Sequence, residues 1–162
     1  MRFTLFLFLV LIALPQAAHA QQQVRLGEIG LAFEVPEDWV EAQYTRWLPQ
    51  IAFYNTKSPD ATHLLSIEYY GTLDALSLAR VKDASVRKRL PAGARVELIP
   101  PEEIPAPFSS GTRISETGCT AYVYAVSVDH KGYILSFTAA DSQDGEATLR
   151  QILASLHFTD SP

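Results

Sequence analysis

The chain has 162 residues and a formal net charge of −5 at pH 7, from 13 lysines and arginines against 18 aspartates and glutamates. A mildly acidic chain is a poor candidate for a nucleic-acid-binding protein, because phosphates favour basic surfaces. Cys119 is the only cysteine, so an internal disulfide is excluded. We interpret Cys119 as a buried small hydrophobe, since no basic residue lies close to it in sequence, and a reactive thiol is the alternative.

The N-terminus is organised like a secretory signal. A short basic start precedes the run from Phe3 to Leu14, which is apolar apart from one threonine, and Ala18-His19-Ala20 has the small residues that a signal peptidase accepts. The run is short for a permanent membrane helix. We therefore expect a signal peptide over residues 1–20, cut after Ala20, and a single domain over residues 21–162. An uncleaved N-terminal anchor is the alternative.

Short strands are predicted in the first third of the expected domain, after a polar leader, Gln21 to Gln23. Val24 to Ile29 is the first candidate, and Leu31 to Val35 alternates so that its apolar side chains share one face. Arg46 to Tyr54 is the next candidate, and its Pro49 places it at a sheet edge or gives it a bulge.

A clearer strand, His63 to Tyr70, follows, and the pattern then changes to a helix. Thr72 or Asp74 can cap this helix, which runs to about Leu90 and is stopped by Pro91. Its imperfect apolar stripe comprises Leu73, Leu76, Ala79, Val86 and Leu90.

A proline-rich segment lies between two further short strands. Arg95 to Ile99 and Thr112 to Glu116 have strand character, whereas Ile99 to Ser110 contains four prolines and is predicted to be an extended loop. Phe108, near the end of this loop, is either an exposed anchor for a partner or a side chain that holds the loop on the core.

The densest β signal is a hairpin. Cys119 to Val128 and Tyr133 to Ala140 flank a polar turn that ends in Gly132, which we expect to supply the positive φ of the reversal. Neither face of the first strand is charged, so the hairpin is predicted to be buried on both sides at the centre of a sheet. Ala121 and Ala125 would let a helix approach one face closely.

The last predicted element is an amphipathic helix whose N-terminal cap lies within Asp141 to Asp144. Its apolar positions have i, i+3, i+4, i+7 spacing and are Leu149, Ile152, Leu153 and Leu156. The order of elements predicts an α+β fold, with a mainly antiparallel sheet and helices packed on both of its faces.

Two stretches resemble PsbP-like domains. Leu31 to Trp39 is similar to the Phe-x-x-Pro-x-x-Trp opening of that group, and the closing helix through Leu156-His157-Phe158 is similar to the way such domains end. The group includes the PsbP subunit of photosystem II, a Ran-binding nuclear-import factor and exported bacterial proteins. The resemblance implies an α/β/α sandwich with an antiparallel sheet, and it implies no site residues.

No catalytic or metal-binding signature is present in the sequence. His63, His130 and His157 are far apart and lack metal-ligand spacing. The acids at the start of the closing helix complement its dipole better than they match a calcium loop. We expect no catalytic residue, cofactor or metal.

A concentration of basic residues on the first predicted helix is the strongest candidate for a contact surface. It comprises Arg80, Lys82, Arg87, Lys88 and Arg89. In an acidic protein such a set forms a local positive patch that can meet an acidic partner or an anionic membrane surface, and the alternative is a solvated helix face. Phe108 is the other candidate contact.

The hypothesis is an exported, non-enzymatic binding or accessory protein, periplasmic or secreted, that contacts an unknown protein or envelope component. It would bind no nucleic acid and keep no permanent membrane span after cleavage of the signal. The alternative is a small periplasmic hydrolase or ligand-binding enzyme whose site is assembled from scattered residues.

Overall fold

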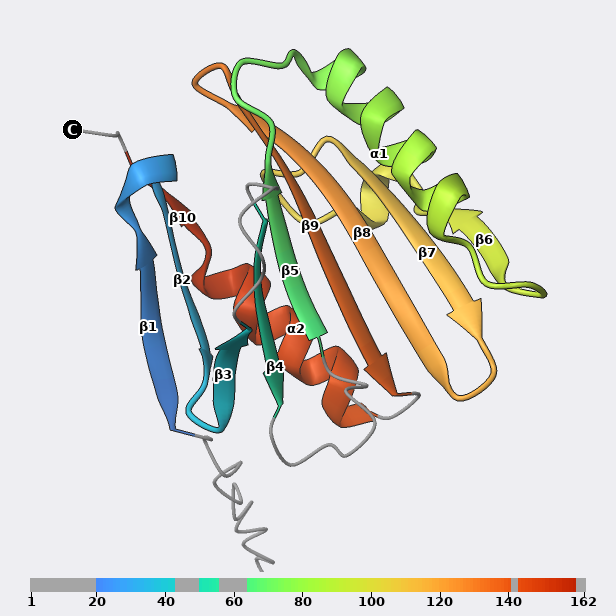
Figure 1. The fold of residues 1–162 in the computed structure, drawn as a ribbon, viewed down its shortest axis with the longest axis horizontal. Helices are drawn as coiled ribbons and strands as arrows, with labels where there is room; N and C mark the ends of the chain where they lie inside the picture. The colour runs from blue at the N-terminus through green and yellow to red at the C-terminus, as the bar shows by residue number, and fades with distance from the viewer. Residues whose placement is uncertain (1–19, 43–49, 56–63, 141–142, 160–162) are drawn as a thin grey trace, which may run out of the picture.

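The computed structural model describes residues 20–42, 50–55, 64–140 and 143–159 (Figure 1). The predicted signal peptide lies outside these ranges, except for Ala20. Within them, no helix is both long enough and apolar enough to cross a membrane.

The described strands form two antiparallel sheets. The larger has seven strands in the order β3 (Trp39–Ala42), β4 (Gln50–Asn55), β5 (Leu64–Tyr69), β9 (Lys131–Ala140), β8 (Cys119–Val128), β7 (Ser110–Glu116) and β6 (Arg95–Leu98). The smaller has three strands in the order β1 (Gln21–Leu26), β2 (Leu31–Pro36) and β10 (His157–Phe158). The sequence predicts one sheet. This part of the prediction is wrong, because β1, β2 and β10 form a separate sheet.

The β8–β9 hairpin occupies the interior of the larger sheet, as predicted. Its register runs from Cys119 opposite Ala140 to Val128 opposite Lys131, and β7 and β5 flank it. The predicted role of the turn glycine is wrong. Asp129 and His130 hold the positive φ angles, of 49° and 63°, so the reversal is made by these two residues.

Gly132 has a packing role instead. It is buried, and a Cβ atom placed on it would lie 3.1 Å from Cδ1 of Leu78. Leu78 belongs to α1 (Ala75–Arg89) and is itself fully buried. The glycine therefore lets α1 approach the sheet closely.

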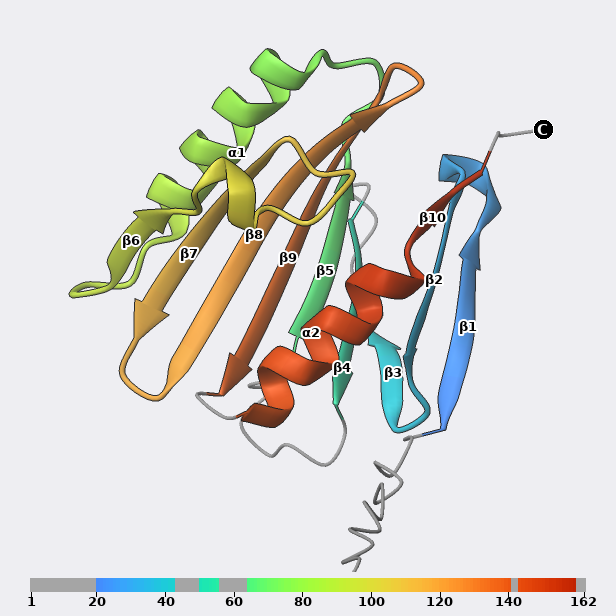
Figure 2. The same cartoon turned by 180° about the vertical axis from the view of Figure 1, so that it is seen from behind.

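The two helices cover opposite faces of the larger sheet, which confirms the predicted α+β sandwich (Figure 2). Helix α1 packs on one face of β8 and β9, where Leu78 and Val86 contact Val123, Ala125 and Ile134. Helix α2 (Gln143–Ser155) lies on the other face, in the larger core.

Strand β2 supplies one wall of that larger core. Leu31, Phe33 and Val35 are buried on the face that meets α2, as their alternation predicts. Ser155 of α2 accepts a hydrogen bond of 2.8 Å from the backbone N–H of Glu34. The Tyr133 hydroxyl donates to the Ile29 carbonyl, so it links the larger sheet to the turn between β1 and β2.

Two early predictions differ from the structure. The residues predicted as a polar leader, Gln21 to Gln23, begin β1, which ends at Leu26 rather than Ile29. Strand β4 lies between β3 and β5, so it is not an edge strand, and Pro49 falls outside the described residues.

Candidate functional site

Helix α1 begins where the sequence predicts. The carboxylate of Asp74 accepts hydrogen bonds from the backbone N–H of Ser77 at 2.8 Å and from its hydroxyl at 2.9 Å. These bonds lower the pKa of Asp74, the backbone bond being the main cause. The helix ends before Leu90-Pro91, because a residue that precedes proline avoids the helical region.

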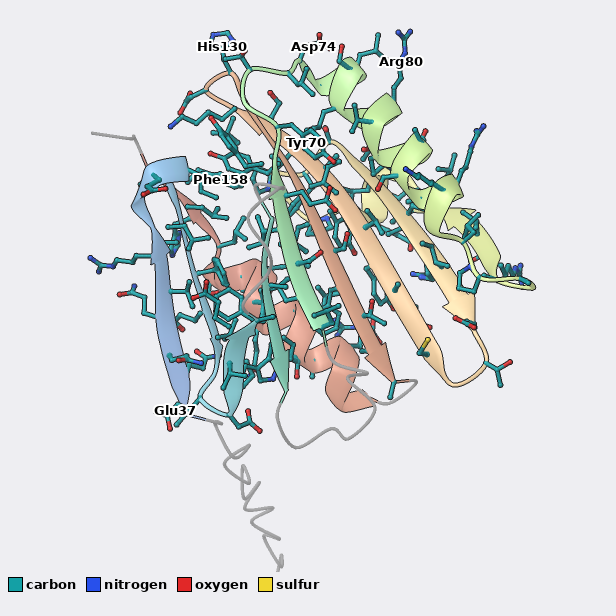
Figure 3. All side chains as sticks on the ribbon, in the orientation of Figure 1. Glu37, Tyr70, Asp74, Arg80, His130 and Phe158 are labelled. Carbon is teal, nitrogen blue, oxygen red and sulfur yellow. The ribbon has the colours of Figure 1, made fainter. Side chains whose placement is uncertain are left out.

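The exposed residues along the body of α1 form a mixed basic and apolar surface, which we call the outer face of α1. Its residues are Leu76, Arg80, Ala84, Arg87 and Lys88, and all are exposed. Arg80 points away from the sheet (Figure 3). Leu76 is 65% exposed and adds an apolar side chain to this surface.

The cations of the outer face are not neutralised locally. Within the described ranges, Arg80, Arg87 and Lys88 make no ion pair. The chain as a whole carries −5, so this helix face departs in sign from the rest of the protein. Arg89 is the last residue of α1, and its side chain lies outside the described part of the structure.

Lys82 does not belong to this surface, which corrects its prediction as a contact residue. Its side chain is 1% exposed and its Nζ donates to Oγ1 of Thr112 on β7, at 2.7 Å. Oδ1 of the half-exposed Asp83 lies 3.2 Å from the same Nζ. The spacing along the helix predicts this burial. Lys82 lies four residues from both Leu78 and Val86, which are buried, so the three side chains share one face of α1.

Phe108 is also buried, so its prediction as a partner contact is corrected. It is 8% exposed, and its ring centroid lies 5.2 Å from that of Tyr124. The alternative stated from the sequence, that Phe108 holds the loop on the core, is confirmed. The loop itself contains only one short turn of helix, η2 (Pro101–Glu103), among its described residues.

A groove of about 310 Å³ lies between the C-terminal half of α1 and the larger sheet. Val86 lines it from the helix, and Ser66, Ser136 and Thr138 line it from the sheet. Cys119, which is half-buried, lies at its margin. Small and hydroxyl side chains leave this space open beside the helix, and Glu116 adds a carboxylate to the lining.

A second cleft, of about 230 Å³, lies between α2 and the proline-rich loop, and we call it the α2 cleft. Tyr122 and Tyr124 of β8 have parallel rings with centroids 6.4 Å apart. The Arg113 guanidinium lies 5.6 Å from the Tyr122 ring centroid and 3.8 Å from the Glu103 carboxylate. On α2, Glu146 accepts a 2.7 Å hydrogen bond from Arg150.

Burial controls the chemistry of the α2 cleft. Desolvation, followed by the nearby Tyr122, raises the pKa of Tyr124 to about 12, so its hydroxyl stays neutral at physiological pH. Each arginine of the cleft has a carboxylate beside it, so the charges are largely balanced. Glu103 and Glu146 are carboxylates of this cleft, and Nε of Arg113 is buried without a hydrogen-bond partner among the described residues.

The histidines and acidic residues are not gathered into a metal site in the described ranges. His130 and His157 are exposed and His63 lies outside those ranges. Across the same residues, no group of three histidine, cysteine or acidic side chains is close enough to hold a metal ion.

Neither a protein-family model nor a curated protein sequence matches this chain. Solved structures do. Cyanobacterial PsbP (CyanoP) from Synechocystis is similar over 89% of this chain and 95% of its own, with a TM-score of 0.63 and 11% identity. The Ran-binding protein Mog1p of Saccharomyces cerevisiae is similar over 88% of this chain and 97% of its own, with a TM-score of 0.58 and 10% identity.

LpqN of Mycobacterium tuberculosis, which is involved in cell envelope biogenesis, is similar over 87% of this chain and 91% of its own. Its TM-score is 0.50 and its identity 16%. At these identities the likeness concerns the fold, and it agrees with the resemblance found in the opening and closing stretches of the sequence. The chain therefore has the PsbP/Mog1-like α+β fold.

Proposed function

We propose that this chain is an exported, non-catalytic binding protein that docks on an acidic partner protein through the outer face of α1. The observation that carries the proposal is the set of exposed cations, Arg80, Arg87 and Lys88, that lack a carboxylate partner in the described structure. Unpaired cations on a rigid helix can meet carboxylates of a partner without first breaking ion pairs of their own.

The apolar content of the same face fits a protein partner. Leu76 lies four residues before Arg80, so the two share one side of the helix. An exposed leucine beside arginines resembles the core and rim of a protein interface, where arginine is enriched. The partner would cover Leu76 and pair with the arginines around it.

A protein partner is favoured over an anionic bilayer. A net charge of −5 opposes the approach of the whole molecule to an anionic lipid surface. An acidic patch on a protein is local, so it can attract the outer face of α1 while the rest of the chain stays at a distance. Stable bilayer binding also needs large apolar side chains, and Leu76 is the one large apolar residue on this face.

The fold and the N-terminus support the rest of the proposal. Mog1p, which has a similar fold, is a Ran-binding protein, and LpqN is involved in cell envelope biogenesis. The signal-like sequence before Ala20 supports export to the periplasm or the outside of the cell, followed by cleavage at that residue. Fractionation of the native cells and N-terminal sequencing of the recovered protein would test this part.

The contact surface is tested by capture of partners from the native envelope fraction. The variant Arg80→Glu/Arg87→Glu reverses two cations of the outer face of α1, and Arg25→Glu/Arg150→Glu makes the same change in net charge on β1 and α2. We expect the first variant to lose a partner that wild type and the second variant both retain. Equal recovery by all three proteins would overturn the proposal.

A vesicle experiment separates the two kinds of anionic surface. Wild-type protein is mixed with vesicles of phosphatidylglycerol and phosphatidylcholine and with vesicles of phosphatidylcholine alone. We expect no preference between them. Co-sedimentation with the anionic vesicles alone, abolished by Arg80→Glu/Arg87→Glu, would instead identify a membrane surface as the target.

A further inference from the structure

Strand β6 (Arg95–Leu98) ends the larger sheet beside α1 (Figure 1). It pairs with β7 on one side, and no strand of the described ranges pairs with its other side. Natural sheets usually protect such an edge with a short strand, charged side chains, proline or a bulge. β6 is four residues long and carries Arg95 and Glu97, but it contains no proline and pairs with β7 in continuous register from Arg95 to Leu98.

The backbone hydrogen bonds show which groups of β6 face outward. The N–H of Ile99 donates to the Gly111 carbonyl at 3.0 Å, in register with Leu98 opposite Thr112. Hydrogen-bonded and non-hydrogen-bonded pairs alternate along an antiparallel ladder. The backbone groups of Glu97 therefore point to β7, and those of Val96 and Leu98 point to the open edge.

The side chains of β6 divide into an apolar and a charged face. Val96 is 41% exposed and Leu98 is 74% exposed, and both lie on the α1 side of the sheet, opposite Ile114 and Thr112. Leu98 also borders a mainly apolar hollow of about 390 Å³. On the other face, Arg95 and Glu97 form an ion pair of 2.6 Å.

These features fit a second copy of the same strand. We propose that the protein forms a two-fold symmetric dimer in which β6 pairs antiparallel with β6 of a second copy, with Val96 opposite Val96. The two Val96 residues exchange backbone hydrogen bonds, and each Leu98 N–H reaches the Ala94 carbonyl of the other copy. The two seven-stranded sheets then become continuous.

The charges select this register. With the two Val96 residues opposite each other, each Arg95 faces a Glu97 of the other copy, in the closer, non-hydrogen-bonded type of pair. A register centred on Glu97 would place the two Glu97 carboxylates opposite each other. A register centred on Leu98 would place Val96 opposite Pro100, which has no N–H to donate.

Sedimentation equilibrium of the purified protein over a range of concentrations tests the dimer. We expect wild type to pass reversibly from monomer to dimer. Val96→Pro removes an outward-facing N–H without removing a bond to β7, so it should abolish the dimer. Leu98→Lys, which places a charge on the exposed apolar face, should do the same and keeps the test valid if the proline variant folds poorly.

A charge swap tests the register. Arg95→Glu alone and Glu97→Arg alone each place like charges opposite each other, and each should weaken the dimer about tenfold. Because Arg113 lies 4.0 Å from Glu97 in the same copy, the double variant Arg95→Glu/Glu97→Arg is made in an Arg113→Gln background. There it restores opposite charges between the copies and should return to within about threefold of Arg113→Gln alone. Circular dichroism verifies that every variant is folded.

Three outcomes would overturn this inference: a monomeric wild type at every concentration, a dimer that survives both Val96→Pro and Leu98→Lys, or a swap that fails to restore association. Arg80→Glu/Arg87→Glu should dimerise like wild type. Failure of the docking proposal and failure of the dimer are therefore distinguishable.

Discussion

Nζ of Lys82 lies 2.7 Å from Oγ1 of Thr112, in a contact that α1 and β7 bury almost completely. The bond joins the helix that carries the outer face of α1 to the strand next to β6. It holds the helix on the sheet with an ammonium group, and the half-exposed carboxylate of Asp83 balances the charge. Lys82 therefore stabilises the position of the proposed docking surface without being part of it.

Loss of the hydrogen bond between Lys82 and Thr112 should lower the free energy of unfolding only when it leaves a cavity or an unpaired polar group. Lys82→Ala does both and should lower the free energy of unfolding by about 2–4 kcal/mol. Lys82→Met/Thr112→Val replaces both partners with apolar groups of similar size and should remain within about 1 kcal/mol of wild type. Urea denaturation measures both values, and equal losses would contradict the account.

The close approach of α1 to β9 at Gly132 gives a second prediction. Gly132→Val would push on Leu78, because even a Cβ lies 3.1 Å from Cδ1 of that leucine, and should cost about 1–3 kcal/mol. In Gly132→Val/Leu78→Ala the space vacated by the leucine should accommodate the valine. A double-mutant cycle by urea denaturation should therefore show a loss smaller than the sum of the single losses. Additive losses would show that the two residues do not share this space.

The proline-rich loop should depend on Phe108. Phe108→Ala removes the ring that packs on Tyr124 and should lower the free energy of unfolding by about 3–5 kcal/mol. Hydrogen exchange should rise at the N–H of Phe108 itself, which donates to Pro105, and at the N–H of Ser109, which donates to Ala125. Unchanged stability, together with loss of a captured partner, would restore the exposed-anchor interpretation.

The raised pKa of Tyr124 predicts an alkaline loss of stability. Its folded-state pKa is about 12, above the ordinary value of 10.0, so the unfolded chain releases this proton first as the pH rises. The contribution of Tyr124 is fully present below pH 10 and is lost between pH 10 and about 12. Burial raises the pKa of Tyr133 too, so it adds a loss of the same sign.

Tyr124→Phe isolates the first contribution, since phenylalanine has no proton to release. Urea midpoints across this range should fall less steeply with pH for the variant than for wild type. Parallel curves would show that Tyr124 titrates as it does in the unfolded chain.

Local patterns in the sequence predict much of this fold. The Asp74 cap, the spacing of Leu149 and Ile152, and the uncharged faces of the hairpin each reflect interactions within one element or between neighbours in the chain. Such patterns depend on helical or strand periodicity, which is visible in one sequence. The resemblance of the opening and closing stretches added the sandwich architecture.

The separate three-stranded sheet depends instead on a long-range pairing. Phe158 of β10 pairs with Leu31 of β2, and two residues of strand leave almost no local signal. By residue type alone, the ammonium group of Lys82 and the ring of Phe108 each suit a contact surface. Their burial follows from where β7 and β8 pass, which depends on sheet order rather than on neighbours in sequence.

Site-specific photocrosslinking tests the docking surface most directly. A photoreactive phenylalanine analogue is placed at Leu76 or Ala84 on the outer face of α1, and at the exposed Ala147 or Ala154 of α2 as matched controls. After irradiation of native envelopes, we expect an adduct with one acidic protein from the α1 positions and not from the α2 positions. Adducts from α2 alone, or from neither helix, would contradict docking through the outer face of α1.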